Sequence, residues 1–385
     1  MIIGIDARVL QEHSGGVFVY AKNLLTHLIP LAKKHKIKLF LNQYKSCPSK
    51  IIDELSEYEN VRKYQYRFPN KFLNTCLKFA KWPNIDDLIH GCDVLFFPSM
   101  MYSSWSEKTK TVLTMHDLSY EFFPECFTQK QRIWHKLMNP RELCDNVSKI
   151  IAVSESTRSD ISEIYKIDKK KIKTVHSGID NIFHPIIDTE HIKRIRNKYN
   201  LPEGKYIIQT GTLEPRKNHI ATIDAFSKWA LENTTESKDW RLLFVGHSGW
   251  KSSKVLRAVR RSLFSDRIHI INETPLVDMP ALYSLSQIFV YPSFYEGFGF
   301  PPLEAASCGI PVITSANSSL GEIVSNAGLL INPYRIDEII FAIRSLVNSD
   351  TLYKSLRAKG LARSVEFNWE KSARETLKVI ESLCI

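Results

Sequence analysis

The sequence predicts an α/β fold made of two doubly wound parallel sheets, each in its own domain. Short apolar runs alternate with longer amphipathic stretches along the chain, a pattern typical of βαβ units. The runs form two series, which a polar and charged stretch separates at about residues 180–204. The length of 385 residues also fits two or three domains that each bury a core.

The strand candidates are rich in Ile and Val, as expected of strands buried on both faces of a parallel sheet. The first series is Ile2–Ile5, Lys38–Leu41, Asp93–Phe97, Thr111–Met115, Ile150–Val153 and Ile172–Val175. The second is Tyr206–Gln209, Leu242–Val245, Ile268–Ile271, Ile288–Tyr291, Pro311–Thr314 and Gly328–Ile331. Helical patterns lie between them, for example at Tyr20–Leu31, Ile220–Leu231 and Ile336–Val347.

These patterns predict an N-terminal domain over residues 1–182, a linker over 183–204 and a C-terminal domain over 205–368. A last amphipathic helix is predicted over 369–385. Sheets of this kind bind ligands beyond the carboxyl ends of their strands. We therefore expect two such edges to face one cleft.

Composition excludes several classes of protein. With 44% hydrophobic residues, the chain is not disordered, and no apolar run reaches the ~18–20 residues of a membrane-spanning helix. The N-terminus lacks the basic region of a signal peptide, and seven Cys without a CxxC pair predict reduced thiols in a cytoplasm. Motifs of zinc proteases, P-loop NTPases, α/β-hydrolases and nicotinamide-dependent oxidoreductases do not occur, and no metal site is predicted.

The net charge of +11 lies more in the N-terminal half, most visibly in Arg62–Trp82, where basic and aromatic residues mix. After Pro69, apolar residues recur at helical spacing, at Phe72, Leu73, Cys76, Leu77 and Ala80. Two interpretations stay open: a surface helix that packs this face on the core, or an interfacial helix whose Phe79 and Trp82 enter an anionic membrane. Nucleic acid is not an expected partner, because no binding motif accompanies the charge.

The most informative stretch is Tyr291–Val312, YPSFYEGFGFPPLEAASCGIPV. It predicts a strand, a Gly-containing loop and a helix that starts near its two prolines. Glu296 and Glu304 can face the same cleft, where carboxylates accept hydrogen bonds from sugar hydroxyls. The helix N-terminus and the backbone N–H groups of the preceding loop suit an anionic oxygen. These groups belong to Gly297, Phe298 and Gly299.

Three other strand ends carry candidate residues. Arg216 and Lys217 follow KYIIQ and suit a diphosphate, with an ordinary solvated pair as the alternative. His116 and Asp117 follow TVLTM, where the histidine can bind a substrate or only the backbone. The turn SGG follows the first strand. Its glycines, Gly15 and Gly16, let the backbone approach a ligand closely.

In this order, these stretches resemble the family 4 retaining glycosyltransferases of the GT-B type, also called glycosyl transferase group 1, and especially mannosyltransferase-like members. The likeness covers nearly the whole chain. It runs through IDAR, SGG at 14–16, HDLSYEFFPE at 116–125, VSESTRSDI at 153–161, HSGID at 176–180, GTLEPRKN at 211–218, VGHSGW at 245–250, EGFGFPPLEAASCGIPV at 296–312 and FNWEKSA at 367–373. One departure is Val19–Tyr20, where many relatives have an Arg before the Tyr, which leaves a phosphate contact of that loop unassigned.

The resemblance implies two Rossmann-like domains, an acceptor-binding one over 1–182 and a sugar-nucleotide-binding one over 205–368, with helix 369–385 crossing back onto the first. It implies four catalytic residues: His116, Arg216, Lys217 and Glu296. Arg216 and Lys217 are expected at the donor diphosphate, Glu304 at the ribose, and Glu296 and His116 at the donor sugar. The remaining implied contacts are Gly15, Gly16, Thr274, Leu276, Gly297, Phe298 and Gly299 to the donor, and Asp117 on the acceptor side.

The resemblance further implies a cytoplasmic hexosyltransferase that retains anomeric configuration and needs no metal or other cofactor. The expected donor is GDP-mannose, and the expected acceptor is a glycan, free or linked to polyprenyl diphosphate, in surface polysaccharide, O-antigen or lipopolysaccharide synthesis. Peripheral attachment to an anionic membrane surface is part of this expectation. Alternatives are transfer of rhamnose, glucose or GlcNAc from a UDP, GDP or dTDP carrier, and a sugar-nucleotide-binding subunit without turnover.

Overall fold

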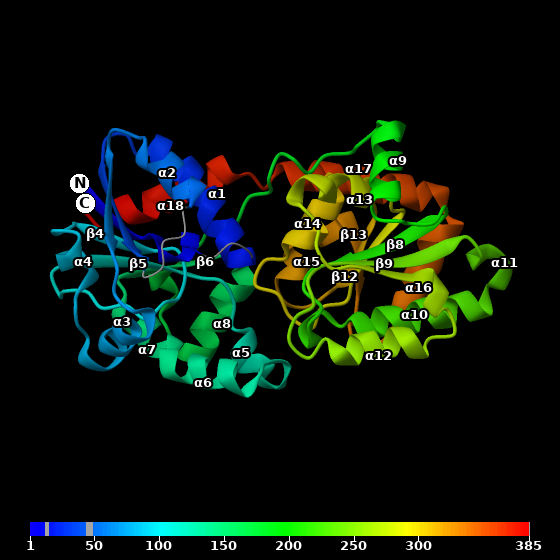
Figure 1. Cartoon of the computed structure of the whole chain (residues 1–385), viewed down its shortest axis with the longest axis horizontal. Helices are drawn as coiled ribbons and strands as arrows, with labels where there is room; N and C mark the ends of the chain where they lie inside the picture. Colours follow the sequence, from blue (N-terminus) through cyan, green and yellow to red (C-terminus); the bar gives the residue numbers. More distant parts are fainter. Residues whose placement is uncertain (12–14, 44–48, 385) are drawn as a thin grey trace. The chain divides into compact units, whose positions relative to one another are not determined.

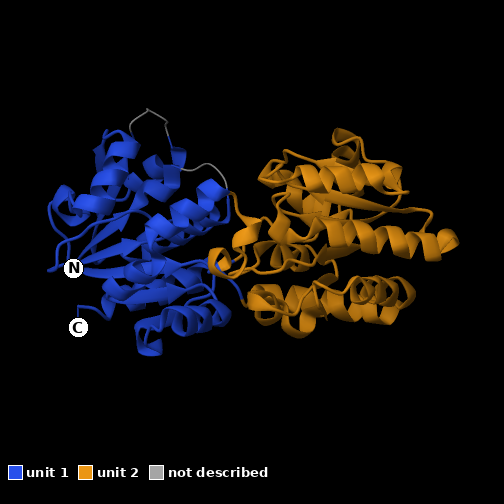
Figure 2. Ribbon diagram, turned by 90° about the horizontal axis from the view of Figure 1, so that it is seen from below, with its two compact units in different colours: residues 1–118, 129–178, 367–385 blue, residues 119–128, 179–366 orange. Residues whose placement is uncertain are grey.

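The computed structural model describes residues 1–11, 15–43 and 49–384. The chain forms two compact units (Figure 2), of which unit 1 holds residues 1–118, 129–178 and 367–385, and unit 2 holds 119–128 and 179–366. Residues 183–204, predicted as a linker, lie in unit 2 and contain helix α9 (Thr189–Lys198). Residues 119–128, predicted within the N-terminal domain, also belong to unit 2.

Within its described residues, unit 1 has a seven-stranded parallel sheet in the order β3-β2-β1-β4-β5-β6-β7. The strands are β1 (Ile2–Asp6), β2 (Lys36–Asn42), β3 (Val61–Tyr66), β4 (Val94–Phe97), β5 (Lys110–Met115), β6 (Lys149–Ala152) and β7 (Ile172–Thr174). The order reverses between β1 and β4, so a ligand crevice is expected at the carboxyl ends of these two strands.

Helices cover both faces of this sheet (Figure 1). They are α1 (Gly16–Leu31), α2 (Lys50–Ser56), α3 (Asn70–Thr75), α4 (Ile85–Leu88), α6 (Gln129–Met138), α7 (Pro140–Asn146), α8 (Glu155–Tyr165) and α18 (Trp369–Glu381). The C-terminal α18 packs against α1, with the rings of Tyr20 and Trp369 5.9 Å apart. A Cβ at Gly178 would lie 2.3 Å from the Trp369 backbone N, so this crossing requires glycine.

The basic, aromatic segment differs from its prediction. Its first part is edge strand β3, which was missed because VRKYQY mixes polar and apolar residues instead of forming an apolar run. The helix predicted after Pro69 is present as α3 and a π-helical turn, η2 (Cys76–Ala80). Leu73 and Leu77 are buried, but Phe72 is 60% exposed, so the predicted apolar face is only partly covered.

In the part of unit 2 that the structure describes, a six-stranded parallel sheet has the order β10-β9-β8-β11-β12-β13. The strands are β8 (Lys205–Thr210), β9 (Trp240–Val245), β10 (Ile268–Ile271), β11 (Ile288–Tyr291), β12 (Val312–Ser315) and β13 (Gly328–Ile331). The helices besides α9 are α5 (Ser119–Phe122), α10 (His219–Glu232), α11 (Thr234–Ser237), α12 (Ser253–Arg261), α13 (Met279–Ser284), α14 (Phe300–Ser307), α15 (Ser318–Val324), α16 (Ile336–Asn348) and α17 (Asp350–Val365).

Alternate residues of the unit 2 strands feed two cores, one on each face of the sheet. On β9, Leu242 and Phe244 belong to the core that contains Trp229, whereas Leu243 and Val245 belong to the core that contains Tyr283. This follows from the two-residue period of a strand. Both sheets are thus parallel and doubly wound, which confirms the predicted α/β fold of two Rossmann-like domains.

Candidate functional site

The predicted donor residues of unit 2 meet where β8 and β11 end. These strands are neighbours, and the strand order reverses between them. Arg216 and Lys217 lie in a 3-10 turn, η5 (Pro215–Lys217), after β8. Glu296 lies in the loop between β11 and α14. The topology therefore brings these three residues to the point where doubly wound sheets bind ligands.

The Glu296 carboxylate is buried and fully engaged. Its Oε1 accepts hydrogen bonds from Lys217 Nζ (2.6 Å) and Ser293 Oγ (2.7 Å). The Tyr291 hydroxyl donates to the same oxygen (3.1 Å) and accepts from Lys217 Nζ (2.6 Å). Oε2 pairs with Arg216 Nη1 at 2.8 Å. Each carboxylate oxygen thus has its own cation, which fixes the side chain on both sides.

Arg216 joins the two loops. Its Nη2 pairs with Glu214 Oε1 (2.8 Å), and its Nη1 donates to the Tyr295 carbonyl (2.7 Å). In return, the Phe294 N–H donates to the Arg216 carbonyl (2.9 Å), which the Ser293 hydroxyl also approaches, at 3.1 Å. Backbone and side chain together hold the loop after β8 against the loop after β11.

We call Glu214, Arg216, Lys217 and Glu296 the charge cluster; its two cations balance its two carboxylates. Burial alone would raise the pKa of Glu296, but Arg216 and Lys217 outweigh it and lower that pKa to about 2. Burial lowers the pKa of Lys217, as does Arg216, while Glu296 and Glu214 oppose the shift. Lys217 is only 9% exposed, which does not fit an ordinary solvated basic pair.

The loop from Glu296 to Gly299 is held at the start of α14. Gly299 caps the helix with φ 98°, and a Cβ there would lie 2.6 Å from Leu320 Cδ2, so the position requires glycine. The Glu296 N–H donates to Ser318 Oγ (3.0 Å). Ser319 Oγ lies 2.8 Å from the Glu296 carbonyl and 2.9 Å from the Phe298 carbonyl, and its single proton is shared between them. Gly297 lies in the same loop, and α14 begins at Phe300, just before the predicted prolines.

Glu304 lies on α14 in a different environment. Its Oε2 accepts a hydrogen bond from the Tyr283 hydroxyl (2.7 Å), which also contacts Thr210 Oγ1 (2.8 Å). No cation of the described residues forms an ion pair with it. Burial raises the pKa of Glu304 to about 7; Asp180 adds to this shift and Tyr283 opposes it.

The predicted nucleobase contacts follow the neighbouring strand β10. Thr274 lies in the loop after it, and Leu276 starts a 3-10 turn, η7 (Leu276–Asp278). Leu276 is 45% exposed. Both residues therefore stand at the carboxyl edge of the sheet that carries the charge cluster.

His116, Asp117, Gly15 and Gly16 belong to unit 1. Gly15 caps α1 with φ 101°, a conformation that favours glycine, and Gly16 starts the helix. Ser14 of the SGG motif lies outside the described residues. The unit 1 residues follow β1 and β5, at the carboxyl edge of the first sheet.

The His116 ring is half-buried, 4.7 Å from the Tyr20 ring in an edge-on arrangement. Burial lowers the pKa of His116, while the Pro98 carbonyl and Asp117 act in the opposite direction. Its Nε2 lies 2.9 Å from the Pro98 carbonyl. Because a carbonyl only accepts, Nε2 carries the proton, and the neutral ring has Nδ1 as its acceptor.

Sequence reasoning missed the partners that complete the charge cluster: Glu214, Tyr291 and Ser293. The sequence did indicate where they lie: Glu214 is two residues before Arg216, and Tyr291 and Ser293 are at the end of a predicted strand. It also missed that residues 119–128 pack in unit 2. There Phe123 stacks on Phe294 (6.1 Å), and Trp250 Nε1 donates to the Cys126 carbonyl (2.6 Å).

Within residues 1–11, 15–43 and 49–384, no helix has the length and apolar character needed to cross a membrane. The basic, aromatic segment of unit 1 nevertheless leaves large apolar side chains in solvent. Phe79 is 71% and Trp82 64% exposed, next to Lys78 and Lys81 in the chain.

Comparison with known proteins adds to this geometry. The family model Glycosyltransferase Family 4 matches residues 14–181, and the model Glycosyl transferases group 1 matches residues 191–363. O-antigen chain mannosyltransferase B of Escherichia coli is 32% identical over 274 residues, which is 71% of each chain. The serotype-specific mannosyltransferase WbdA of Escherichia coli is 29% identical over 266 residues, 69% of this chain but 32% of that protein.

Among solved structures, sucrose-phosphate synthase from Thermosynechococcus elongatus matches with a TM-score of 0.77 at 20% identity. The match covers 99% of this chain and 98% of that one. At this identity, the similarity concerns the fold.

Proposed function

The chain belongs to the group 1 glycosyltransferases, and on this premise we propose that it transfers mannose from GDP-mannose to a growing surface glycan. The observation that carries the proposal is the buried charge cluster at the strand-order reversal of unit 2. The choice of mannose is supported by the O-antigen chain mannosyltransferase that is 32% identical to this chain.

In this proposal, Arg216 and Lys217 hold the donor diphosphate. The free protein has equal numbers of cations and carboxylates in the cluster, so a bound diphosphate competes with Glu296 for the two cations. Glu304, on the neighbouring helix, accepts hydrogen bonds from the ribose hydroxyls, and Thr274 and Leu276 border the base. The sugar hydroxyls face Glu296 and the backbone of Gly297–Gly299.

The transfer step breaks the bond between the sugar carbon and the diphosphate oxygen, and forms a bond from that carbon to an acceptor hydroxyl oxygen. The acceptor attacks from the face that the diphosphate leaves, so configuration is retained, and a phosphate oxygen takes the hydroxyl proton. Arg216 and Lys217 stabilise the charge on the leaving diphosphate, which makes a metal unnecessary. Glu296 is too strongly paired to be a nucleophile; it orients the donor sugar.

The acceptor is a glycan, in keeping with the O-antigen enzyme among the relatives. We further propose that it is linked to a polyprenyl diphosphate and met at an anionic membrane. The exposed Phe72, Phe79 and Trp82 of unit 1 enter the interface, where Lys71 and Lys78 meet lipid phosphates.

The donor is tested by measuring transfer and thermal stability with GDP-mannose, UDP-glucose, UDP-GlcNAc and dTDP-rhamnose. GDP-mannose should give product that retains configuration, with and without EDTA, and a ligand at 100 times its Kd adds about 2.7 kcal/mol of stability. If only UDP or dTDP sugars stabilise the protein, GDP-mannose is not its donor. Binding without turnover on any glycan would leave a non-catalytic binding subunit.

Membrane attachment is tested by sedimentation with anionic and neutral vesicles. Binding should be specific to anionic vesicles, fall with salt, and be lost when Lys71, Lys78 and Lys81 become Glu. A matched control changes three exposed lysines elsewhere in unit 1, Lys33, Lys34 and Lys173, to Glu. If both variants lose vesicle binding equally, the binding depends on the net charge of the protein and not on this segment.

A further inference from the structure

Unit 1 contains a pocket of about 460 Å³. Its lining includes none of the residues assigned to the transfer reaction. Its walls are η2 with the residue that follows it, the loop between β4 and β5 with the start of β5, and the end of α6 with α7. Its volume lies within the range usual for ligand sites. The side chains that matter here are Lys78, Lys81, Tyr102, Trp105, Glu107 and Glu142.

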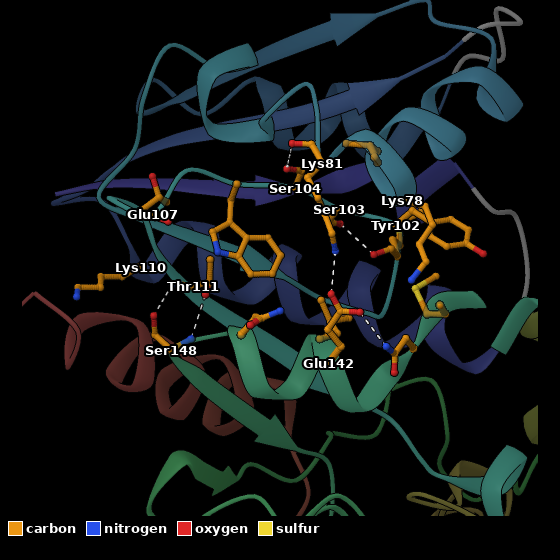
Figure 3. Close-up of a pocket in the computed structure, with 18 residues that line it drawn as sticks. Lys78, Lys81, Tyr102, Ser103, Ser104, Glu107, Lys110, Thr111, Glu142 and Ser148 are labelled. Atoms are coloured by element: carbon orange, nitrogen blue, oxygen red, sulfur yellow. Dashed lines mark hydrogen bonds and ion pairs between the residues drawn. The ribbon is translucent and has the colours of Figure 1, made fainter. Parts of the chain in front are cut away.

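The pocket is elongated. Figure 3 shows Lys78 and Tyr102 toward one end, and Lys110 and Ser148 at the other. The Tyr102 end is tied to the carboxyl edge of the sheet, because Arg8, just after β1, donates to the Tyr102 carbonyl (2.8 Å). Lys110 begins β5, about 20 Å along the strand direction from His116 at the opposite edge. The pocket therefore leads away from the edge where transfer is proposed.

The lining is polar and mixed in charge. Lys81 Nζ pairs with Glu142 Oε1 at 3.1 Å, and Asn139 Nδ2 donates to Glu142 Oε2 at 2.8 Å (Figure 3). Glu107 adds a second carboxylate to the lining, and Lys78 and Lys110 add two more cations. Three lysines thus face two carboxylates, so most of the positive charge is neutralised within the lining and little is left to hold a phosphate or nucleotide. An acyl chain is disfavoured too, because it would displace water from these charged side chains without replacing the hydrogen bonds that the water makes.

An aromatic side chain completes the lining. Trp105 is half-buried, and its ring packs 5.4 Å from the ring of Phe97. A neutral sugar fits this combination: its C–H groups pack on an aromatic face, and its hydroxyls both donate to carboxylates and accept from amides and lysines. This chemistry matches a polyol better than an anion or a lipid.

We propose that this pocket binds sugar residues of the acceptor glycan that lie behind its growing end. The proposal deepens the proposed function, on which it relies only for naming the glycan as the acceptor. A chain held here stays on the protein after each transfer, while its terminal residue reaches the carboxyl edge of the sheet. The pocket thus gives the enzyme a preference for long acceptors over short ones.

Binding is tested by titrating a mannopentaose into the full chain without donor. Glu142→Ala removes an exposed ion pair, so the fold should tolerate it, and Trp105→Ala removes the aromatic surface. Each change should weaken mannopentaose binding at least tenfold and leave GDP binding unchanged. The matched control, Glu163→Ala, changes an exposed glutamate of α8 that does not line the pocket and should bind like the unaltered protein.

The kinetic test compares a long mannan acceptor with a single methyl mannoside. Glu142→Ala should raise KM at least tenfold for the long acceptor and leave KM and kcat for the methyl mannoside unchanged. Equal effects on both acceptors, or unchanged mannopentaose binding in both variants, overturn the proposal. Dependence of anionic-vesicle binding on Glu142, without an effect on mannopentaose, overturns it as well. If no acceptor is mannosylated, the proposed function fails, while mannopentaose binding still decides the pocket.

Discussion

Two carboxylates of unit 2, Glu296 and Glu304, are eight residues apart in the sequence and have opposite electrostatic environments. Glu296 is buried between two cations, and its pKa falls to about 2. Glu304 is bonded to the neutral Tyr283 hydroxyl, and its pKa rises to about 7. Burial acts in the same direction on both, so the difference lies in their partners.

This comparison separates a carboxylate that is held charged from one that is close to protonation at neutral pH. The stability that Glu296 contributes is complete above pH 4.5 and is lost as pH falls toward 2. For Glu304 the sign is reversed: the folded state holds the proton more tightly, so its effect on stability is unfavourable at high pH. The first carboxylate suits a fixed structural and donor-orienting role, and the second a site whose charge responds to a bound ligand.

The largest expected effect is on the stability of the charge cluster. Glu296→Ala leaves Lys217 and Arg216 buried with one carboxylate fewer, and should lower the free energy of unfolding by about 3–5 kcal/mol in chemical denaturation at pH 7. The control is Glu232→Ala, which breaks the exposed pair with Arg344 and should cost less than about 1 kcal/mol. If the two variants lose similar amounts of unfolding free energy, burial does not make the Glu296 pairs stronger than an exposed ion pair.

Glu304 should produce a pH dependence of stability between pH 4.5 and 7. As pH rises through this window, the folded state keeps a proton that the unfolded state releases, so stability falls by about 3 kcal/mol. Glu304→Gln removes this slope. The measurement is the difference between the unfolding free energies of the two proteins at each pH, and a constant difference from pH 4.5 to 8 would refute the raised pKa.

Transfer should depend on both members of the Glu296–Lys217 pair. Lys217→Ala removes a cation from the leaving diphosphate, and Glu296→Ala removes the group that orients the donor sugar. Each should lower kcat/KM at least about 100-fold, measured at a temperature where both variants are folded. Near-normal transfer by either variant would remove that residue from the catalytic set.

The smallest expected effect concerns the Tyr283 hydroxyl. Tyr283→Phe removes one buried hydrogen bond to Glu304 and should cost about 1 kcal/mol of stability. Because that bond lowers the pKa of Glu304, its loss should move the titration of Glu304 to higher pH. The titration is followed through the pH dependence of the unfolding free energy, and a shift to lower pH would contradict the assigned hydrogen bond.

Much of the fold was predictable from the sequence, because buried parallel strands are continuous apolar runs. Edge strand β3 was not, since half of its residues are polar and exposed, so it contains no apolar run. The motif residues Arg216, Lys217 and Glu296 were also identifiable, because they follow recognisable strands. Their mutual pairing was not, because neighbours in a sheet are set by strand order and not by sequence distance.

The pocket of unit 1 marks another limit of sequence reasoning. Its lining comes from segments without a shared motif, and Trp105 and Glu142 stood out in no pattern. Lys78 and Lys81 did stand out, as part of a basic, aromatic segment. Only the fold brings them into one pocket with Glu142, where Lys81 is paired with that carboxylate and most of the lysine charge is offset by glutamates.

The measurement that tests the central claim most directly is calorimetric titration of GDP into three proteins: the unaltered chain, Lys217→Gln and Glu296→Gln. If Arg216 and Lys217 bind the diphosphate in competition with Glu296, Lys217→Gln should weaken GDP binding at least tenfold. Glu296→Gln should bind GDP at least as tightly as the unaltered chain, although both variants lose transfer. GDP binding that is unchanged in Lys217→Gln, or weakened equally in both variants, would contradict this account of the donor site.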